Sequence, residues 1–311
     1  MRLWMTSGVV AVLTLISLPA RAWWPQGHSM IAEAAVESLP AEVPQWFRDG
    51  DQAVAHFAQD PDLEKVRELA LMNERESALH FFDLELLRGR PIPPTRAEFL
   101  RLTRELNVAP SEIGELPYSL GEMTQRLTVA FAETRRFPNN VYARQKALFY
   151  AGILSHYAAD AAMPLHTTVH YDGRLKSDGQ SPRSGIHAKI DSLVEKLAFE
   201  PSELRAQNVL PLPELLPGIL NQIAEAHAQV DSAYAIEGLL PPSEDANQNA
   251  NQNAENWRPS PLVRAWTRDR ARNGARFTAQ LFLTAWRDSQ EVTLPAWLQR
   301  KNSNGAAPTA P

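Results

Sequence analysis

The feature that most restricts the possible folds is a long uncharged stretch near the middle of the chain. Residues 147–159 carry no formal charge, and apolar residues recur at helical spacing, so we expect a helix over residues 140–163. His156 and Asp160 lie four residues apart and share one face of that helix. The row on this face continues backwards through Phe149, Gly152 and Ile153. The sequence thus places an imidazole and a carboxylate on the side that should be buried.

A buried carboxylate needs a compensating partner, because burial of an unpaired charge costs several kcal/mol. The same His-x3-Asp spacing returns at His187 and Asp191, beside an apolar row that begins at Ile186. One such pair alone is more often a surface hydrogen bond on a helix. Two pairs favour metal binding, together with His166, which Pro164 can turn back toward the same pocket.

Two upstream segments offer further donors. His80 stands among apolar neighbours, and Asp60 and Asp62 lie at the start of an expected helix over residues 61–72. Each has a simple structural alternative: His80 as a hydrogen-bonded core histidine, and Asp60 as the N-cap of that helix. They gain weight in combination with the two His-x3-Asp pairs.

Helical periodicity extends through most of the chain, whereas long period-two alternation is hard to find. The chain is 44% hydrophobic and 22% charged, which is ordinary for a globular protein with its own core. The sequence therefore predicts an all-α protein. We expect helices over residues 29–38, 61–72, 117–135, 140–163, 185–198, 211–236 and 261–287.

Both ends of the chain and one internal segment are predicted to lie outside the packed domain. Residues 1–22 have the pattern of a signal peptide, which predicts export to the periplasm or the medium after cleavage before Trp23. Residues 301–311 form a polar tail, which leaves a domain over residues 23–300. Within that domain, residues 243–257 form a polar low-complexity loop.

Composition excludes several classes of function. The chain has no cysteine, so thiolate chemistry and disulfides are excluded. Its formal charge is 31 − 36 = −5, and loss of Arg2 and Arg21 with the leader makes it 29 − 36 = −7. This balance argues against a polybasic nucleic-acid clamp. After the leader, no uncharged stretch reaches the roughly 20 residues that span a membrane.

The opening of the expected mature chain, WWPQGH, adds Trp23 and His28. With His-x3-Asp-x5-His at residues 156–166 and His-x3-Asp at residues 187–191, it resembles the superfamily of zinc-dependent phospholipases C and single-strand-specific nucleases of the S-one/P-one type. In order and spacing the resemblance extends over residues 23–191. It implies a single multi-helix domain with three zinc ions, one of them held by the amine and carbonyl of the first mature residue.

The resemblance also implies the ligands of each ion. The first zinc would be held by Asp62, His80, His156 and Asp160, the second by His166, His187 and Asp191, and the third by Trp23, His28 and Asp160. Such nitrogen and oxygen donors suit zinc without sulfur. Asp62 is preferred to Asp60 because the related nucleases have a basic residue three positions after this aspartate, and Lys65 stands at that distance from Asp62.

The activity implied by the resemblance is hydrolysis of phosphodiesters in single-stranded DNA or RNA, and of 3′-nucleotides. Clustered zinc ions neutralise phosphate oxygens and lower the pKa of water toward about 7. By the same resemblance, Asp62 orients or deprotonates the attacking water and Lys65 contacts phosphate. Phe81 and Asp83 would stack on the base and hydrogen-bond to it. The simpler alternatives are a solvated Lys65 and a Phe81 that packs in the core.

Two other functions stay open at this point. A zinc-dependent phospholipase C would act on a phospholipid head group, but these enzymes have a carboxylate at the fourth mature position, where this chain has Gln26. A noncatalytic binding module would keep zinc for folding alone, and its metal site would be closed to solvent. No stable protein partner is implied.

Overall fold

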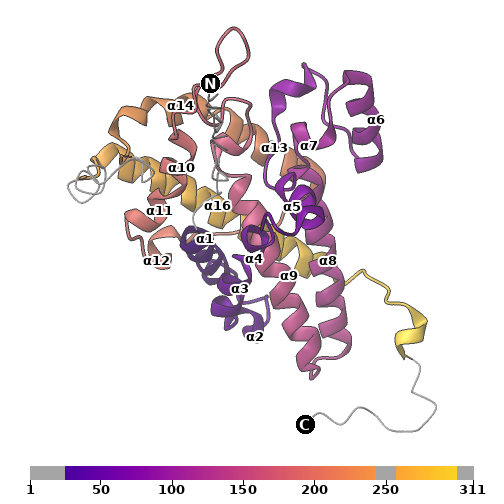
Figure 1. Cartoon of the computed structure of the whole chain (residues 1–311). Helices are drawn as coiled ribbons and strands as arrows, with labels where there is room; N and C mark the ends of the chain where they lie inside the picture. The colour runs from indigo at the N-terminus through magenta and orange to yellow at the C-terminus, as the bar shows by residue number, and fades with distance from the viewer. Residues whose placement is uncertain (1–24, 243–256, 300–311) are drawn as a thin grey trace, which may run out of the picture.

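The computed structural model describes residues 25–242 and 257–299 (Figure 1). The predicted signal peptide, Trp23, the polar tail and all but the last residue of the low-complexity loop lie outside the described residues. The domain boundaries predicted from the sequence therefore stay predictions.

The described chain consists of α-helices and short 3₁₀ turns, with no strand in either described range, which confirms the predicted all-α class. The α-helices are α1 (Pro25–Glu37), α2 (Gln45–Arg48), α3 (Asp51–Phe57), α4 (Asp60–Leu63), α5 (Ala70–Ser77), α6 (Arg96–Leu106), α7 (Pro110–Ile113), α8 (Leu116–Arg136), α9 (Val141–Asp160), α10 (Ile186–Asp191), α11 (Leu193–Lys196), α12 (Pro201–Leu204), α13 (Leu215–His227), α14 (Val230–Ala235) and α16 (Pro261–Asp288). The 3₁₀ turns are η1 (Leu84–Leu87), η2 (Pro164–His166), η3 (Glu237–Leu239) and η4 (Ala296–Gln299). Among these elements, none is both long and apolar enough to cross a membrane.

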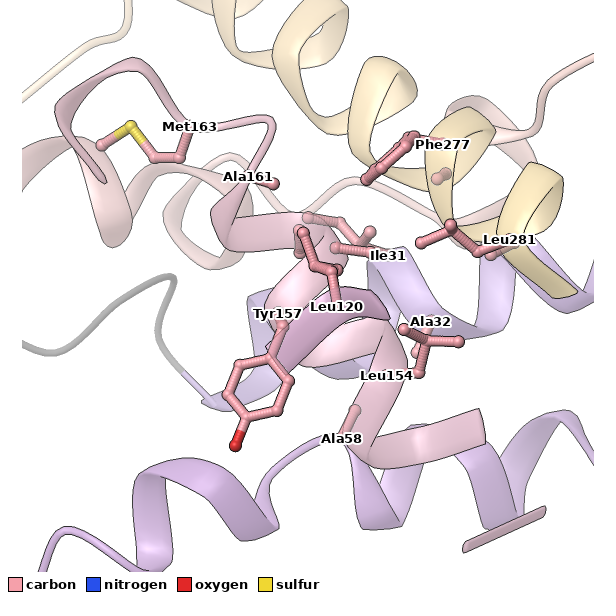
Figure 2. Packing of buried hydrophobic residues seen from close by; sticks show 14 of the residues in the cluster. Ile31, Ala32, Ala58, Leu120, Leu154, Tyr157, Ala161, Met163, Phe277 and Leu281 are labelled. Carbon is pink, nitrogen blue, oxygen red and sulfur yellow. The ribbon is translucent and has the colours of Figure 1, made fainter. Parts of the chain in front are cut away.

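Helix α9 lies at the centre of the single hydrophobic core. It forms an antiparallel pair with α8 and also packs against α1, α3 and α16 (Figure 1). Figure 2 shows Phe277 and Leu281 of α16 close to Ile31 of α1, and all three side chains are buried. The C-terminal half of α9, which carries the first His-x3-Asp pair, is thus surrounded by long helices on several sides.

The long helices follow the predicted boundaries to within four residues, because local signals set their ends. The Asn140 side chain accepts hydrogen bonds from the backbone N–H groups of Tyr142 and Ala143 and so begins α9. Ser260 begins α16 in the same way by accepting from the backbone N–H of Val263. One residue of the predicted buried row differs. Phe149 is 37% exposed, and its ring packs edge-on against the ring of Phe57.

Three predicted helices are interrupted. The prediction of one helix over residues 61–72 is wrong, because α4 ends at Leu63 and α5 begins only at Ala70. Leu63, Val66 and Leu69 have helical spacing, but their side chains stay exposed, and short helices depend on packing for stability. The N-cap interpretation of Asp60 is also wrong, because Gln59 takes that position without a side-chain hydrogen bond.

The other two interruptions lie farther along the chain. The helix expected over residues 185–198 is divided into α10 and α11 at Ser192. The helix expected over residues 211–236 starts late, at Leu215, after Pro211 and Pro213, whose missing N–H groups disfavour an earlier helix. It is then interrupted between α13 and α14.

Candidate metal centre

The structure contains three groups of His and Asp side chains that could each hold a metal ion. Within each group, one nitrogen or oxygen atom per residue lies within 4.8 Å of the others. The groups are His28, Asp62 and His156; His80, His156 and Asp160; and His166, His187 and Asp191. Every metal ligand predicted from the sequence belongs to one of them, except Trp23, which lies outside the described residues. Residues separated by more than 160 positions in the chain therefore converge at one place.

Asp160, at the end of α9, connects these groups. Its Oδ2 atom lies 3.0 Å from Nδ1 of His80 and 3.5 Å from Nε2 of His156. Its Oδ1 atom lies 3.5 Å from Nε2 of His28 and 3.6 Å from Nδ1 of His166. Both oxygens of one carboxylate thus face histidines from different groups, which is the position predicted for a bridging carboxylate.

The grouping around His156 differs from the predicted ligand sets. His28, predicted to share an ion with Trp23 and Asp160, stacks on the ring of His156 with centroids 3.6 Å apart. Asp62, predicted to lie with His80, groups with these two rings, and its Oδ1 atom is 3.9 Å from Nε2 of His156. Among the described residues, Asp60 belongs to no such donor group, and the choice of Asp62 over Asp60 as a ligand stays a prediction.

Backbone carbonyls fix the orientation of two histidine rings. Nδ1 of His156 lies 2.7 Å from the carbonyl oxygen of Ala58, just after α3, and Nδ1 of His166 lies 2.8 Å from that of His80. A carbonyl only accepts, so each Nδ1 carries the proton and each Nε2 presents a lone pair. Metal-binding histidines are commonly held in this way.

The non-helical segment between α5 and η1, residues 78–83, positions His80. Phe82 donates its backbone N–H to the carbonyl of His166 on one side at 2.9 Å, and Asp83 donates its N–H to the carbonyl of Ile113 on the other at 2.7 Å. The 3₁₀ turn η2, which begins at Pro164, brings His166 against this segment, as the sequence predicted for the turn after α9. The segment that carries His80 is therefore held on both sides by parts of the chain that are remote in sequence.

Burial controls the protonation of the donor groups. It lowers the pKa of His156 and of His166 to about 4, and it lowers the pKa values of His28, His80 and His187 as well. All five imidazoles are therefore neutral near pH 7, the form that binds metal. Burial also raises the pKa values of Asp160 and Asp191, because the surroundings supply too little positive charge to favour the carboxylates.

Several buried polar atoms at the centre have no hydrogen-bond partner in the described protein. They include Nδ1 of His28, Oδ2 of Asp62, Nδ1 of His187 and Oδ1 of Asp191. Nε2 of His187 also lies only 2.9 Å from the lone pair on Nε2 of His166. Unsatisfied carboxylate oxygens and converging imidazole nitrogens are the donor chemistry of a zinc site, so these residues fit zinc ions.

The donor groups open onto a cleft of about 440 Å³. It is lined by Lys65, Arg67, Asn73, Ser77, His80, Phe81, Asp83, Ser111, Glu112, Leu165, His166, Tyr171 and His187. Three predicted metal ligands therefore share this cleft with all three predicted substrate contacts, Lys65, Phe81 and Asp83. Nζ of Lys65 also lies 2.6 Å from Oδ1 of Asp62, which links the cleft to the donor group of His28.

Two residues of the site, Tyr171 and Glu76, were not predicted from the sequence. Tyr171, whose ring meets that of His187 edge-on, belongs to a polar stretch without a motif, so no sequence pattern indicates it. Glu76 lies 3.3 Å from His80 and accepts a hydrogen bond from Tyr157. Its spacing of four residues before His80 was a signal that could have found it.

Burial also raises the pKa values of two further carboxyl groups here. The pKa of Glu76 rises to about 7, and the pKa of Asp83 rises to about 8, with the nearby charge of Glu85 contributing to the second shift. A protonated Asp83 can donate as well as accept a hydrogen bond in the cleft.

Comparisons with known proteins find matches among solved structures alone. No model of a known protein family matches the chain, and no curated protein matches it. Among solved structures, alpha toxin from Clostridium absonum aligns at a TM-score of 0.45 and 13% identity, covering 85% of this chain and 66% of the toxin. Alpha toxin of Clostridium perfringens from an avian strain aligns at a TM-score of 0.45 and 13% identity, covering 88% of this chain and 65% of the toxin. The chain thus spans just under two thirds of each toxin.

Proposed function

We propose that this protein is an exported zinc-dependent phosphodiesterase that hydrolyses single-stranded DNA or RNA and 3′-nucleotides. The observation that carries the proposal is the shared cleft: His80, His166 and His187 line it together with a lysine, an aromatic ring and a buried carboxyl group. A zinc site kept only for folding is closed to solvent. Donors that open onto a cleft of this size favour catalysis over the noncatalytic binding module.

The protein's own residues can bind and orient a phosphodiester in this cleft. Zinc ions held by the three donor groups would supply positive charge for phosphate oxygens and would lower the pKa of water toward about 7. Lys65, whose side chain is 11% exposed, can hold a phosphate oxygen with its ammonium group. Oδ2 of Asp62 has no hydrogen-bond partner and can accept a proton from the attacking water.

Phe81 and Asp83 supply the contacts proposed for a base. Phe81 is partly exposed and lines the cleft, which supports a role in stacking on a base, worth about 1–3 kcal/mol per base. Asp83 is buried beside it and can hydrogen-bond to the edge of a stacked base. These contacts favour an unpaired strand, because the bases of a duplex are stacked on each other and do not present a free face.

Activity of the purified, zinc-loaded protein tests the proposal. We expect release of 5′-nucleotides from denatured DNA or RNA, loss of this activity with a chelator, and recovery with zinc. Lys65→Ala should lower kcat/KM by roughly 10- to 100-fold, the value of a charged hydrogen bond. Lys146→Ala is the matched control, because this lysine pairs with Glu133 far from the cleft. Holoenzyme that is inert on every nucleic acid would overturn the proposal.

One observation favours a phospholipid substrate as the second candidate. The segment that contributes Lys65 and Arg67 to the cleft also exposes four large aliphatic side chains: Leu63 (61%), Val66 (40%), Leu69 (55%) and Leu71 (89%). Exposed aliphatic groups next to a phosphodiesterase cleft suit a lipid surface better than a polyanion. Release of phosphorylated head groups from phosphatidylcholine vesicles, without cleavage of denatured DNA, would decide for this candidate.

A further inference from the structure

The side chain of Tyr171 lines the cleft together with Phe81. It belongs to the loop between η2 and α10, and it is 43% exposed. A large ring that borders a cleft and is not covered by the rest of the protein is available to a ligand. The way the loop holds this ring therefore indicates its role.

Hydrogen bonds hold the backbone on both sides of Tyr171. The carbonyl of His170 accepts the hydroxyl proton of Tyr234 from α14. The carbonyl of Asp172 accepts the backbone N–H of Ser184 at 3.1 Å. A ring on a backbone that is fixed in this way loses little conformational freedom when a ligand stacks on it.

The loop also closes on itself directly after Tyr171. Gly173 has a φ of +105°, and a methyl group there would lie 2.3 Å from Cγ of Pro182. The two arms of the loop thus meet at a position where only glycine fits. Tyr171 lies at this closed base of the loop, next to the cleft.

Phe81 and Tyr171 lie beside different donor groups of the candidate metal centre. Phe81 directly follows His80 in the chain. The ring of Tyr171 meets that of His187 edge-on, with ring centroids 5.7 Å apart. His80 and His187 belong to different donor groups. A phosphate bound between these groups would therefore have an aromatic ring near each end.

The two rings fit the two nucleosides that a phosphodiester joins. In a nucleic acid strand the scissile phosphate has a nucleoside on either side, whereas a 3′-nucleotide has one on a single side. We propose that Tyr171 stacks on the base of the nucleotide attached through its 5′ oxygen, while Phe81 stacks on the base of the nucleoside on the 3′-oxygen side. The inference rests on the proposed function and narrows its preferred substrate to oligonucleotides.

The ratio of kcat/KM on a dinucleoside monophosphate to kcat/KM on a 3′-nucleotide measures this second subsite. With zinc-loaded mature protein, Tyr171→Ala should lower the ratio by roughly 5- to 150-fold, the value of stacking on one base. Tyr171→Phe keeps the ring and should keep the ratio of the wild type. Phe81→Ala should lower both values by similar factors. Tyr142→Ala is the matched control, because Tyr142 is 67% exposed at the opposite end of α9 from Asp160.

A substrate analogue identifies the base that Tyr171 contacts. A dinucleotide without the base on the 5′-oxygen side offers the ring nothing to stack on. The wild type should lose about the same factor on this analogue as Tyr171→Ala loses on the complete substrate. Tyr171→Ala should cleave both with nearly equal efficiency, because the ring and the base act as one interacting pair.

Zinc titration separates a substrate contact from a structural role, because Tyr171 also contacts His187. Tyr171→Leu keeps aliphatic bulk against His187 but has no aromatic face. We expect it to bind zinc as the wild type does and to show the low ratio of Tyr171→Ala. Weaker zinc binding, with equal losses on both substrates, would instead assign Tyr171 a structural role and overturn the proposal.

Two further results would overturn the second subsite. One is an equal ratio in Tyr171→Ala and Tyr142→Ala. The other is a loss on the 3′-nucleotide as large as that on the dinucleotide, which would place Tyr171 and Phe81 on the same base. Wild-type protein that hydrolyses neither substrate refutes the proposed function and the subsite with it. Wild-type protein that hydrolyses both, with an unchanged ratio in Tyr171→Ala, refutes the subsite alone.

Discussion

Gly152 lies one turn before His156 on α9, where α3 packs against it. A methyl group at this position would lie 2.3 Å from Cβ of Phe57 and 2.9 Å from the carbonyl oxygen of Val54. Carbon atoms in contact prefer a separation of about 3.5 Å or more, so α3 and α9 would have to separate by about 1.2 Å, the difference between 3.5 and 2.3. We therefore expect Gly152→Ala to displace the end of α3.

The displacement affects both stability and the metal centre. Overpacking of this kind costs about 1–3 kcal/mol, which corresponds to a fall in Tm of roughly 2–5 °C for a chain of this size. Ala58 directly follows α3, and its carbonyl holds Nδ1 of His156 at 2.7 Å. A shift of about 1.2 Å along this bond would stretch it to about 3.9 Å, beyond hydrogen-bond length. His156 would lose its fixed orientation, and zinc affinity would fall with it.

Thermal unfolding and zinc titration of Gly152→Ala measure these two effects. Gly121→Ala is the matched control, because Gly121 lies within α8 and a methyl group there would meet nothing within 4 Å. The control should gain roughly 0.5–1 kcal/mol, as alanine favours a helix over glycine, and should bind zinc as the wild type does. An equal gain for Gly152→Ala, with unchanged zinc binding, would refute the close packing of α3 on α9 as the support of His156.

Three further outcomes are expected. Removal of zinc with a chelator should lower Tm, and added zinc should restore it, because binding at 1,000 times the dissociation constant stabilises by about 4 kcal/mol; an unchanged Tm would argue against a bound metal. Asp62→Ala should weaken zinc binding in titration, whereas Asp60→Ala should bind as the wild type does; the reverse would exclude Asp62 as a ligand. Burial raises the pKa of Asp83 to about 8 from an unfolded value near 3.9, so the folded wild type loses stability as pH rises from about 4 to 8. Asp83→Asn should escape this loss and gain more than about 1 kcal/mol relative to the wild type between pH 5 and pH 8 in urea unfolding, and a difference independent of pH would contradict the shift.

The predictable part of the fold is the part that local signals specify. Asn140 and Ser260 mark the starts of α9 and α16 by side-chain hydrogen bonds within their own helix, and a sequence shows such contacts directly. The segment over residues 64–69 has helical spacing as well, but its aliphatic side chains find no surface to cover. Whether a short apolar repeat becomes a helix depends on packing with remote parts of the chain, which spacing alone does not reveal.

The same distinction applies to the metal centre. The His-x3-Asp pairs are local patterns, so the sequence could nominate His156, Asp160, His187 and Asp191. The orientation of the rings depends on the carbonyl of Ala58, 98 positions from His156, and on that of His80, 86 positions from His166. No spacing rule connects such partners, because they meet only after the helices have packed.

Under the proposed function, packing and metal binding depend on each other. The helices bring Asp160 and Asp191 together in surroundings that raise their pKa values, so the folded chain without a cation favours protonated carboxyl groups at its centre. A divalent cation reverses that preference, because it binds the ionised form and competes with the proton. With no cysteine to form a disulfide, the chain has no covalent cross-link of that kind to hold these elements. The free energy of the proposed zinc binding would then become free energy of folding, which is why removal of the metal should destabilise the whole domain as well as stop the proposed hydrolysis.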